Sequence, residues 1–202
     1  HFDGTIESYL QIIQHDDRAP LERAMRKAIK RKVPIDLDFR ILDLDGSIRY
    51  MASRGRVLYD ENGDPVRMSG VNIDITERKR VELALRESEK RFHTAFDQAT
   101  IGMALVSTDG RFLQVNLSAC KILGYSEQEL LVTDFKSVTH PQDLGASLES
   151  IRRILAGETD AFQIEKRYIH KSGRTIWASL SISLLRDGDG QPLYFIAQIQ
   201  DI

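Results

Sequence analysis

An internal repeat is the feature of this sequence that most constrains its fold. Segments from the first third of the chain return near its end, and matched residues such as Asp74 and Asp201 stand 127 positions apart. The matched pairs are Phe39–Ile41 with Lys166–Tyr168, Asp45–Tyr50 with Ser172–Trp177, Gly63–Pro65 with Gly190–Pro192, and Asp74–Ile75 with Asp201–Ile202; Asp16–Arg18 matches Gln142–Leu144 with an offset of 126. This period is far longer than the roughly 20–50 residues of stacked repeats. The sequence therefore predicts two copies of one domain.

The two copies are not equally complete. In the second copy, about 40 residues from Glu89 to Ser126 precede the part that it shares with the first. The first copy therefore starts in mid-domain. The chain begins at His1 without a methionine, signal peptide or transit peptide, and it stops within an apolar strand-like pattern at Asp201–Ile202. We expect both ends to continue in a longer protein.

Local patterns predict an α+β domain. In the second copy, a turn at Asp109–Gly110 between two apolar runs indicates a hairpin, and Asn116 and Ser126 are typical helix caps. A helix over 143–155 precedes strands over 162–170, 176–184 and 193–202, and the first copy offers a helix over 17–31 and strands near 35–43, 47–58 and 66–75. Hairpins with segregated helices favour an antiparallel sheet covered by helices on one face.

A charged helix is expected between the copies, over residues 77–91. This stretch holds ten charged side chains and no glycine or proline. Apolar or small residues recur at heptad-like spacing, at Val81, Leu85, Ser88, Phe92 and Ala95. Two interpretations stay open: a solvated helical spacer, or a signalling helix that pairs with its twin in a dimer.

Composition excludes several classes of protein. The 202 residues carry 28 basic and 30 acidic side chains, a formal charge of −2, whereas nucleic-acid binders usually show a basic excess. One cysteine, Cys120, cannot form an internal disulfide. The longest apolar run is about six residues, too short to cross a membrane. We therefore expect a cytoplasmic segment with no nucleic-acid partner and no membrane insertion of its own, although the parent protein can be membrane-anchored.

Several motifs in a fixed order resemble those of the PAS domain family. They are Gly102–Ala104, Val115–Asn116, Leu123–Ser126, Glu129–Leu130, His140–Asp143, and the strand end Asp74–Thr76 before the charged helix. The resemblance implies a five-stranded antiparallel sheet with flanking short helices and a ligand pocket between them. It divides the chain into the C-terminal part of a first PAS domain (1–76), a linker helix (77–91) and a complete second PAS domain (92–202).

PAS domains are mostly sensory or dimerisation modules, so the resemblance implies a regulatory fragment and not an enzyme. They commonly precede histidine kinase, diguanylate cyclase or phosphodiesterase domains, and this sequence contains the signature of none of these. We expect a covalently attached output domain and a homodimer formed through the linker helix or a sheet face. The alternatives are a structural dimerisation spacer with filled pockets, and a redox sensor that holds flavin or haem.

Signal coupling is expected where a strand runs directly into the linker helix, at Asp74, Ile75 and Thr76. Thr76 can cap the first helical turn, and Asp74 can pair with an arginine such as Arg40. Asp201 occupies the matching position in the second copy. The simpler interpretation is that these residues only end a strand and start a helix.

Candidate pocket residues come from one face of a repeated strand, from the two strands of the predicted hairpin and from Phe135. In the second copy they are Met103, Leu105, Val115, Phe135, Leu180 and Ile182, and in the first copy Met51 and Ser53. All of them serve equally well as core residues. Because Met51, Ser53 and Gly55 match Ala178, Leu180 and Ile182, we expect more room for a ligand in the first copy and a filled pocket in the second.

Known cofactor chemistry finds little support in the sequence. The five histidines and Cys120 lack metal-ligand spacing, so no metal site is predicted. The signature that surrounds the reactive cysteine of flavin photoreceptor domains is absent, and Ile199 stands where those domains carry a glutamine. Covalent flavin is therefore not expected, and Cys120 is interpreted as a small buried apolar residue. The identity of any other ligand stays open.

Overall fold

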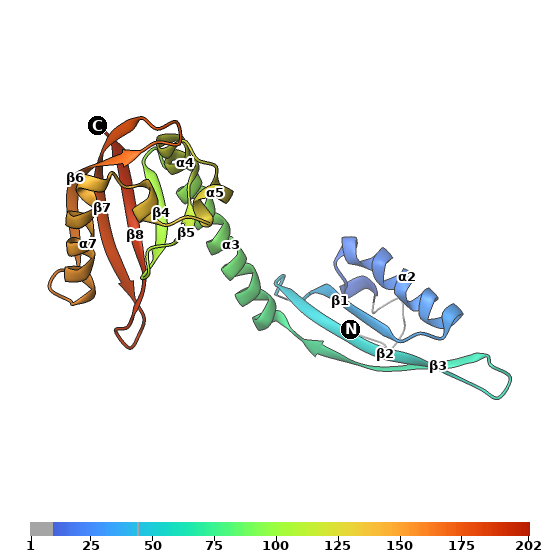
Figure 1. Ribbon diagram of the computed structural model, residues 1–202. Helices are drawn as coiled ribbons and strands as arrows, with labels where there is room; N and C mark the ends of the chain where they lie inside the picture. The colour runs from blue at the N-terminus through green and yellow to red at the C-terminus, as the bar shows by residue number, and fades with distance from the viewer. Residues whose placement is uncertain (1–9, 44) are drawn as a thin grey trace. The chain divides into compact units, whose positions relative to one another are not determined.

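The computed structural model describes residues 10–43 and 45–202, which belong to two compact units. The first unit extends to Ser88 and the second from Glu89 to Ile202. Helix α3 (Thr76–Gln98) is continuous across this division (Figure 1). Each unit contains one antiparallel sheet with helices packed on it.

In its described residues the first unit is a helix on a three-stranded sheet. The elements are α2 (His15–Arg31), β1 (Ile35–Leu42), β2 (Ile48–Tyr59) and β3 (Pro65–Asp74), with strand order β1-β2-β3. Helix α2 packs on β1 and β2 around a small core of Ile13, Leu21 and Phe39. The helix and the three strands that the sequence predicted are therefore confirmed.

The second unit has a five-stranded antiparallel sheet with the order β5-β4-β8-β7-β6. Its elements are β4 (Gly102–Ser107), β5 (Phe112–Val115), α4 (Leu117–Leu123), α5 (Glu127–Leu131), α6 (Phe135–Val138), α7 (Pro141–Leu155), β6 (Ala161–Ile169), β7 (Thr175–Arg186) and β8 (Pro192–Asp201). Helices α4 and α5 contact β4 and β5, and α7 contacts β6 and β7. The predicted α+β fold is confirmed, with a complete second copy and a shorter first one.

The repeat extends to the register of the strands. Arg40 lies opposite Tyr50 in the first sheet, and Arg167 lies opposite Trp177 in the second. Both pairs are related by the 127-residue offset of the sequence repeat. The last three strands of the two units therefore pair in the same order and in the matching register.

Short-range signals position the helices of the second unit as expected. The side chain of Asn116 caps α4 by accepting a hydrogen bond from Ala119 N at 2.8 Å, and Ser126 and Glu129 form a capping box at α5. Asn116 is fully buried, and it also accepts from Met103 N and donates to the carbonyl oxygens of Phe96 and Ile101. All of its polar groups are thus satisfied inside the fold.

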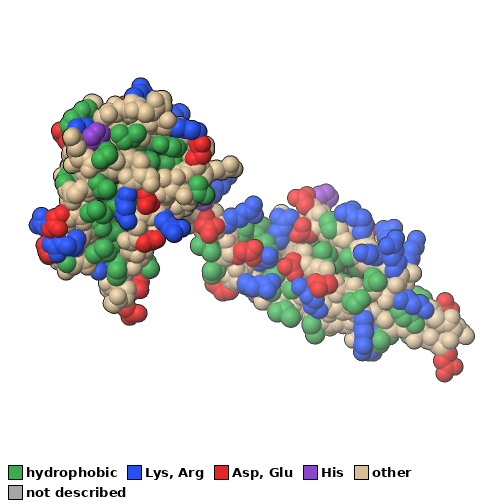
Figure 2. Space-filling view, in the orientation of Figure 1, with side chains coloured by type: hydrophobic (Ala, Val, Ile, Leu, Met, Phe, Trp, Pro, Cys, Tyr) green, Lys and Arg blue, Asp and Glu red, His purple; other side chains and the backbone are tan. Residues whose placement is uncertain are grey.

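The apolar residues at heptad-like spacing on α3 are exposed. Val81, Leu85 and Phe92 keep 67%, 59% and 49% of their surface accessible, and Ser88 and Ala95 are exposed as well. Charged side chains of both signs are scattered among apolar and uncharged polar ones on the face that Figure 2 shows. Within the described residues, no helix combines the length and the apolar character that a membrane crossing requires.

Candidate functional site

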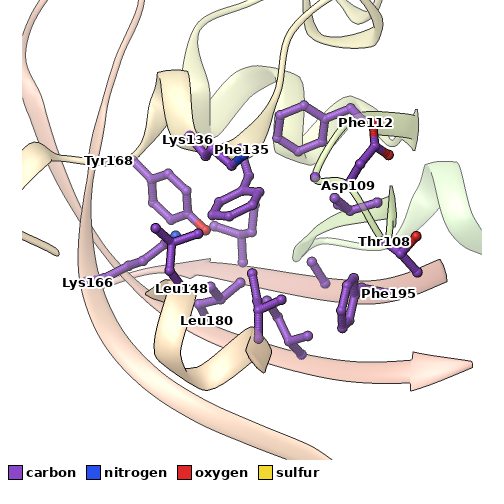
Figure 3. A pocket seen from close by; sticks show the side chains of 16 residues that line it. Thr108, Asp109, Phe112, Phe135, Lys136, Leu148, Lys166, Tyr168, Leu180 and Phe195 are labelled. Atoms are coloured by element: carbon purple, nitrogen blue, oxygen red, sulfur yellow. The ribbon is translucent and has the colours of Figure 1, made fainter. Parts of the chain in front are cut away.

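A cavity of about 360 Å³ lies inside the second unit, between its sheet and helices α6 and α7. Its size falls within the roughly 300–1,000 Å³ range of small-molecule sites. Figure 3 shows mainly aromatic and aliphatic side chains around it, together with the polar side chains of Thr108, Asp109, Lys136 and Lys166. The lining residues are Val106, Thr108, Asp109, Gly110, Phe112, Phe135, Lys136, Leu148, Ile151, Lys166, Tyr168, Leu180, Ile182, Phe195, Ala197 and Ile199.

Strand parity decides which of the expected pocket residues face this cavity. Phe135, Leu180 and Ile182 line it, whereas Met103, Leu105 and Val115 do not. On β4, Ala104 and Val106 are buried, and Met103 and Leu105 alternate with them on the other face of the sheet. Val115 is buried in the core cluster below α4 and α5.

Lys166 is the unusual member of the lining because its amine is buried. The residue is only 2% exposed and projects from β6 into the space between the sheet and the helices. Its Nζ donates to Thr139 Oγ1 at 2.9 Å and reaches Ser147 Oγ at 3.5 Å. The ammonium also lies 4.5 Å from the centre of the Tyr168 ring, a favourable cation–π distance.

The two hydroxyls around Lys166 can only accept from it. The Thr139 hydroxyl donates its proton to Phe135 O, and the Ser147 hydroxyl donates its proton to Asp143 O. Their lone pairs are thus left for the ammonium, which fixes the direction of the lysine side chain. Lys166 forms no ion pair with a carboxylate among the described residues.

The carboxylate of Asp143 attracts the Lys166 ammonium electrostatically, but its hydrogen bonds are made with Arg167. Its two oxygens accept three hydrogen bonds from Arg167, at 2.7–3.0 Å. Burial lowers the pKa of Lys166 to about 8, and the negative charge of Asp143 only partly opposes this. The amine is therefore still mostly charged near neutral pH, without a counterion of its own.

Tyr168 places a second polar group at the same end of the cavity. The residue is 3% exposed, and its hydroxyl has no hydrogen-bond partner among the described residues. Burial raises the pKa of Tyr168 well above its usual range, so the phenol stays protonated. It can donate one hydrogen bond to a group inside the cavity.

The sequence contained a signal for Lys166 that its interpretation missed. The repeat aligns Lys166 with Phe39 and Tyr168 with Ile41. Phe39 is buried in the first unit, at 3% exposure, so this position faces the core in both copies. Lysine is rarely found at a buried position, so its presence at a core position of the repeat indicates a role other than apolar packing.

The compared strand face of the first unit does not provide the larger space that we expected there. The groove at this face measures about 190 Å³, and Ser53 and Gly55 line it, whereas Met51 packs against the small core. The expectation of more room at this face than at the matching face of the second unit was therefore wrong. The second unit keeps the larger cavity because α6 and α7 stand over its sheet, whereas α2 packs closely on β1 and β2.

The junction between β3 and α3 is held to β2 by the backbone of Tyr50. Ile75 N donates to Tyr50 O at 2.8 Å, and Tyr50 N donates to Thr76 Oγ1 at 3.0 Å. Ile75 and Thr76 are both 8% exposed. Helix α3 begins at Thr76, directly after β3, so only Ile75 separates strand from helix.

Two expected contacts at this junction are different in the structure. Asp74, not Thr76, caps α3, because Asp74 Oδ1 accepts from Thr76 N at 2.9 Å while the Thr76 hydroxyl faces Tyr50. The Thr76 hydroxyl and amide, with Arg49 nearby, lower the pKa of Asp74. Arg40 does not pair with Asp74, because its Nε and Nη2 both donate to the carboxylate of Asp17.

The end of the second copy repeats part of this arrangement. Ile202 N donates to Trp177 O at 3.1 Å, as Ile75 N does to Tyr50 O. Asp201 is exposed and lies opposite Ala178, as Asp74 lies opposite Met51. One hydrogen bond of the clamp, from the residue after the last strand to the central strand, thus recurs in the second unit.

Cys120 lies on α4 and outside the cavity lining. Burial raises the pKa of its thiol, which opposes formation of a reactive thiolate. No histidine, cysteine or methionine is among the described residues that line the cavity. Across residues 10–43 and 45–202, no three His, Cys, Asp or Glu side chains are grouped so as to hold a metal ion.

The fold, the repeat and the strand–helix junctions define a class of protein, and the comparison of the sequence with family models agrees. A model described as the PAS fold matches residues 1–72 and 112–199, which is more than half of the chain. The chain therefore belongs to the PAS family, and it carries two PAS segments in tandem.

Relatives come from bacterial signalling proteins. The chain is 45% identical over 126 residues to the probable diguanylate cyclase DgcE of Escherichia coli (strain K12), a match that covers 62% of this chain and 11% of that protein. It is 24% identical over 218 residues to the sensor protein FixL of Bradyrhizobium diazoefficiens, covering 98% of this chain and 40% of that protein. The chain thus spans a minor part of each relative, and the catalytic parts of such relatives lie outside the matched region.

Solved structures support the fold. A PAS domain from Colwellia psychrerythraea superposes with a TM-score of 0.53 at 18% identity, covering 56% of this chain and 95% of that one. A PAS domain of an HTR-like protein from Haloarcula marismortui gives a TM-score of 0.51 at 25% identity, covering 61% of this chain and 99% of that one. The chain is a PAS module of the kind found in diguanylate cyclases and sensor kinases.

Proposed function

We propose that this chain is the sensory and regulatory part of a larger signalling protein. A small molecule bound in the second unit, or a rearrangement between two copies, changes the position of strands that continue into helices. The change then reaches an output domain outside this chain, of the histidine kinase, diguanylate cyclase or phosphodiesterase type. The relatives that contain such PAS segments support this kind of output.

The observation that carries the relay proposal is the clamp between Tyr50 and the β3–α3 junction. The two hydrogen bonds that the Tyr50 backbone makes, with Ile75 N and with the Thr76 hydroxyl, and the Asp74 cap leave no flexible loop between the sheet and the helix. A shift of β2 or β3 therefore has to move the first turn of α3. The matching bond from Ile202 N to Trp177 O supports the same route out of the second unit.

The cavity favours a ligand sensor over a spacer with filled pockets. A space of about 360 Å³ within a folded core costs packing energy that natural cores usually avoid. Among the residues that line it, only Tyr168 belongs to the side-chain types that ligate haem iron. The raised pKa of this tyrosine opposes the phenolate that such a bond needs, so a haem sensor fits these residues poorly.

A parallel pairing of α3 with a second copy of this chain is the second part of the proposal. Val81, Leu85 and Phe92 form an apolar seam that is largely exposed in the single chain, and two such seams would cover each other. The variant Leu85→Glu is expected to shift the chain from dimer to monomer in light scattering coupled to size exclusion. A change at Leu193, which is also exposed but lies on β8, serves as the control.

The relay is tested in the full-length parent protein with Asp74→Ala, Asp74→Asn and a control, Thr94→Val. Asp74→Asn keeps an oxygen that can accept from Thr76 N, whereas Asp74→Ala removes the cap. We expect Asp74→Ala to change the output activity and its response to ligand, Asp74→Asn to change them less, and Thr94→Val to leave them intact. Unchanged output in Asp74→Ala would refute the relay.

A further inference from the structure

The cavity of the second unit has chemically distinct ends. At one end stand the ammonium of Lys166 and the hydroxyl of Tyr168, and Phe112 and Phe195 contribute aromatic walls. Asp109 lies on the side away from Lys166 in Figure 3. It is exposed and pairs with Arg111 at 3.2 Å. An apolar space with a single buried cation therefore faces any ligand that enters.

A buried ammonium without a carboxylate partner is costly, because charges inside proteins are normally paired. Among the described residues, the ammonium is compensated by two hydroxyl lone pairs, by the faces of the Tyr168 and Phe135 rings at 4.5 and 5.7 Å, and by the charge of Asp143, with which it forms no ion pair. Both oxygens of Asp143, the carboxylate that acts on Lys166, are held by Arg167. The part of the chain that the structure describes therefore offers Lys166 no directly paired carboxylate.

We propose that this cavity binds a small organic carboxylate, with its carboxylate against Lys166 and Tyr168 and its apolar body among the aromatic side chains. This inference rests on the sensory function proposed above and names the class of ligand. The Lys166 ammonium supplies charge, and the Tyr168 hydroxyl, which has no other partner among the described residues, supplies a directed hydrogen bond. The volume of about 360 Å³ limits the ligand to small molecules.

The first unit provides an internal contrast that supports this assignment. The position equivalent to Lys166 is Phe39, and the position equivalent to Tyr168 is Ile41. Neither side chain can recognise a carboxylate. The anion selectivity is therefore expected in the second unit alone, although both units share the same strand register.

The test uses three probes with one skeleton: 3-phenylpropionate, 3-phenyl-1-propanol and 3-phenylpropylamine. Binding to the intact chain is measured by calorimetric titration. We expect the carboxylate to bind at least about tenfold more tightly than the alcohol, as a charge-assisted hydrogen bond provides, and the amine to bind most weakly. Lys166→Met is expected to remove the preference for the carboxylate while it retains binding of the alcohol.

Lys136→Met is the matched control, because Lys136 also belongs to the lining but its side chain is exposed. It is expected to change the preference by less than about threefold, since exposed charges are screened. Equal binding of carboxylate and alcohol, or an unchanged preference in Lys166→Met, overturns the carboxylate assignment and leaves the sensory proposal standing. Failure of all three probes to bind overturns both the carboxylate assignment and the use of this cavity for sensing.

Discussion

Arg167 binds Asp143 through its backbone and its side chain together. Arg167 N and Nε donate to Asp143 Oδ2 at 2.8 and 3.0 Å, and Nη2 donates to Oδ1 at 2.7 Å. Arg40 binds Asp17 in the first unit through the same three atoms, each at 2.8 Å. This pair joins the first turn of α2 to β1 in the first unit and the first turn of α7 to β6 in the second. In the second unit it also occupies both oxygens of Asp143, which therefore forms no ion pair with Lys166.

Loss of this pair should destabilise the second unit. We expect Asp143→Asn to lower its free energy of unfolding by about 2 kcal/mol, because charge-assisted hydrogen bonds to Arg167 are lost. Trp177, the single tryptophan, lies in this unit, so the midpoint of its fluorescence transition in urea measures the effect. Asp17→Asn is the control and should leave that midpoint unchanged; an equal shift in both variants would contradict this account.

The same pair should shape the acid limb of stability. Arg167 lowers the pKa of Asp143 to about 2, from its ordinary value of 3.8. Because the folded pKa is the lower one, the stabilisation is present above about pH 4 and is lost as pH falls toward 2. Urea titrations of wild type and Asp143→Asn should therefore converge between pH 4 and 2, and a constant difference across that range would argue against the pair.

Replacement of Lys166 by methionine should stabilise the chain in the absence of ligand. The change removes a buried charge, keeps the volume roughly constant, and leaves Thr139 and Ser147 bonded to backbone carbonyl oxygens. We expect a gain on the order of 1–3 kcal/mol at pH 7 in the Trp177 transition. A loss of stability would mean that the lysine is a structural residue.

Lys166 should also change how the free energy of unfolding depends on pH above neutrality. Its folded pKa of about 8 lies below the ordinary value of 10.5, so the unfolded chain binds more protons between these values. The free energy of unfolding should therefore rise with pH from about 8, by on the order of 2 kcal/mol. Because burial raises the pKa of Tyr168, stability should fall again above about pH 10. Lys166→Met should lack the rise.

Alanine substitutions at two glycines distinguish the free-energy cost of backbone strain from that of steric overlap. Gly124 and Gly157 have positive φ angles of 78° and 74°, which favour glycine. A Cβ on Gly124 would overlap the His170 ring, whereas a Cβ on Gly157 would meet nothing within 4 Å. We expect Gly157→Ala to cost about 1 kcal/mol and Gly124→Ala distinctly more. Equal costs would show that the His170 ring moves aside freely.

The clamp at the β3–α3 junction should appear in amide hydrogen exchange. Thr76→Val removes the oxygen that accepts from Tyr50 N, and an unsatisfied buried N–H costs about 1–3 kcal/mol. We expect exchange at Tyr50 and Ile75 to accelerate by about tenfold or more, measured by NMR. Thr94→Val, whose hydroxyl bonds within its own exposed helix turn, should leave these amides unchanged.

Local signals explain why much of the fold could be predicted from the sequence. Asn116 and Ser126 act on neighbours within three residues, and the alternation around Leu180 gives the inward face of β7 directly. The repeat predicted which segments correspond, and the structure gives them the same register. Such features need no knowledge of distant parts of the chain.

The cavity could not be predicted in the same way, because it depends on which side chains meet across the fold. The burial of Lys166 depends on Thr139 and Ser147, which are 27 and 19 positions away. Met103 and Leu105 were expected to line the cavity, but they lie on the other face of β4. The sequence of one strand does not show which of its two faces points inward when the neighbouring strands are unknown. The partner of Arg40 was visible in principle, since Asp17 and Arg40 both recur in the second copy as Asp143 and Arg167.

Native mass spectrometry of the freshly purified chain shows whether this module binds a small molecule in its second unit. We expect a species heavier than the 23.0 kDa chain by the mass of one small acid, shed on denaturation and absent from Lys166→Met. Addition of 3-phenylpropionate should restore a one-to-one complex in the wild type if the natural ligand is lost in purification. Only the bare mass, both as purified and with added carboxylate, would contradict the account.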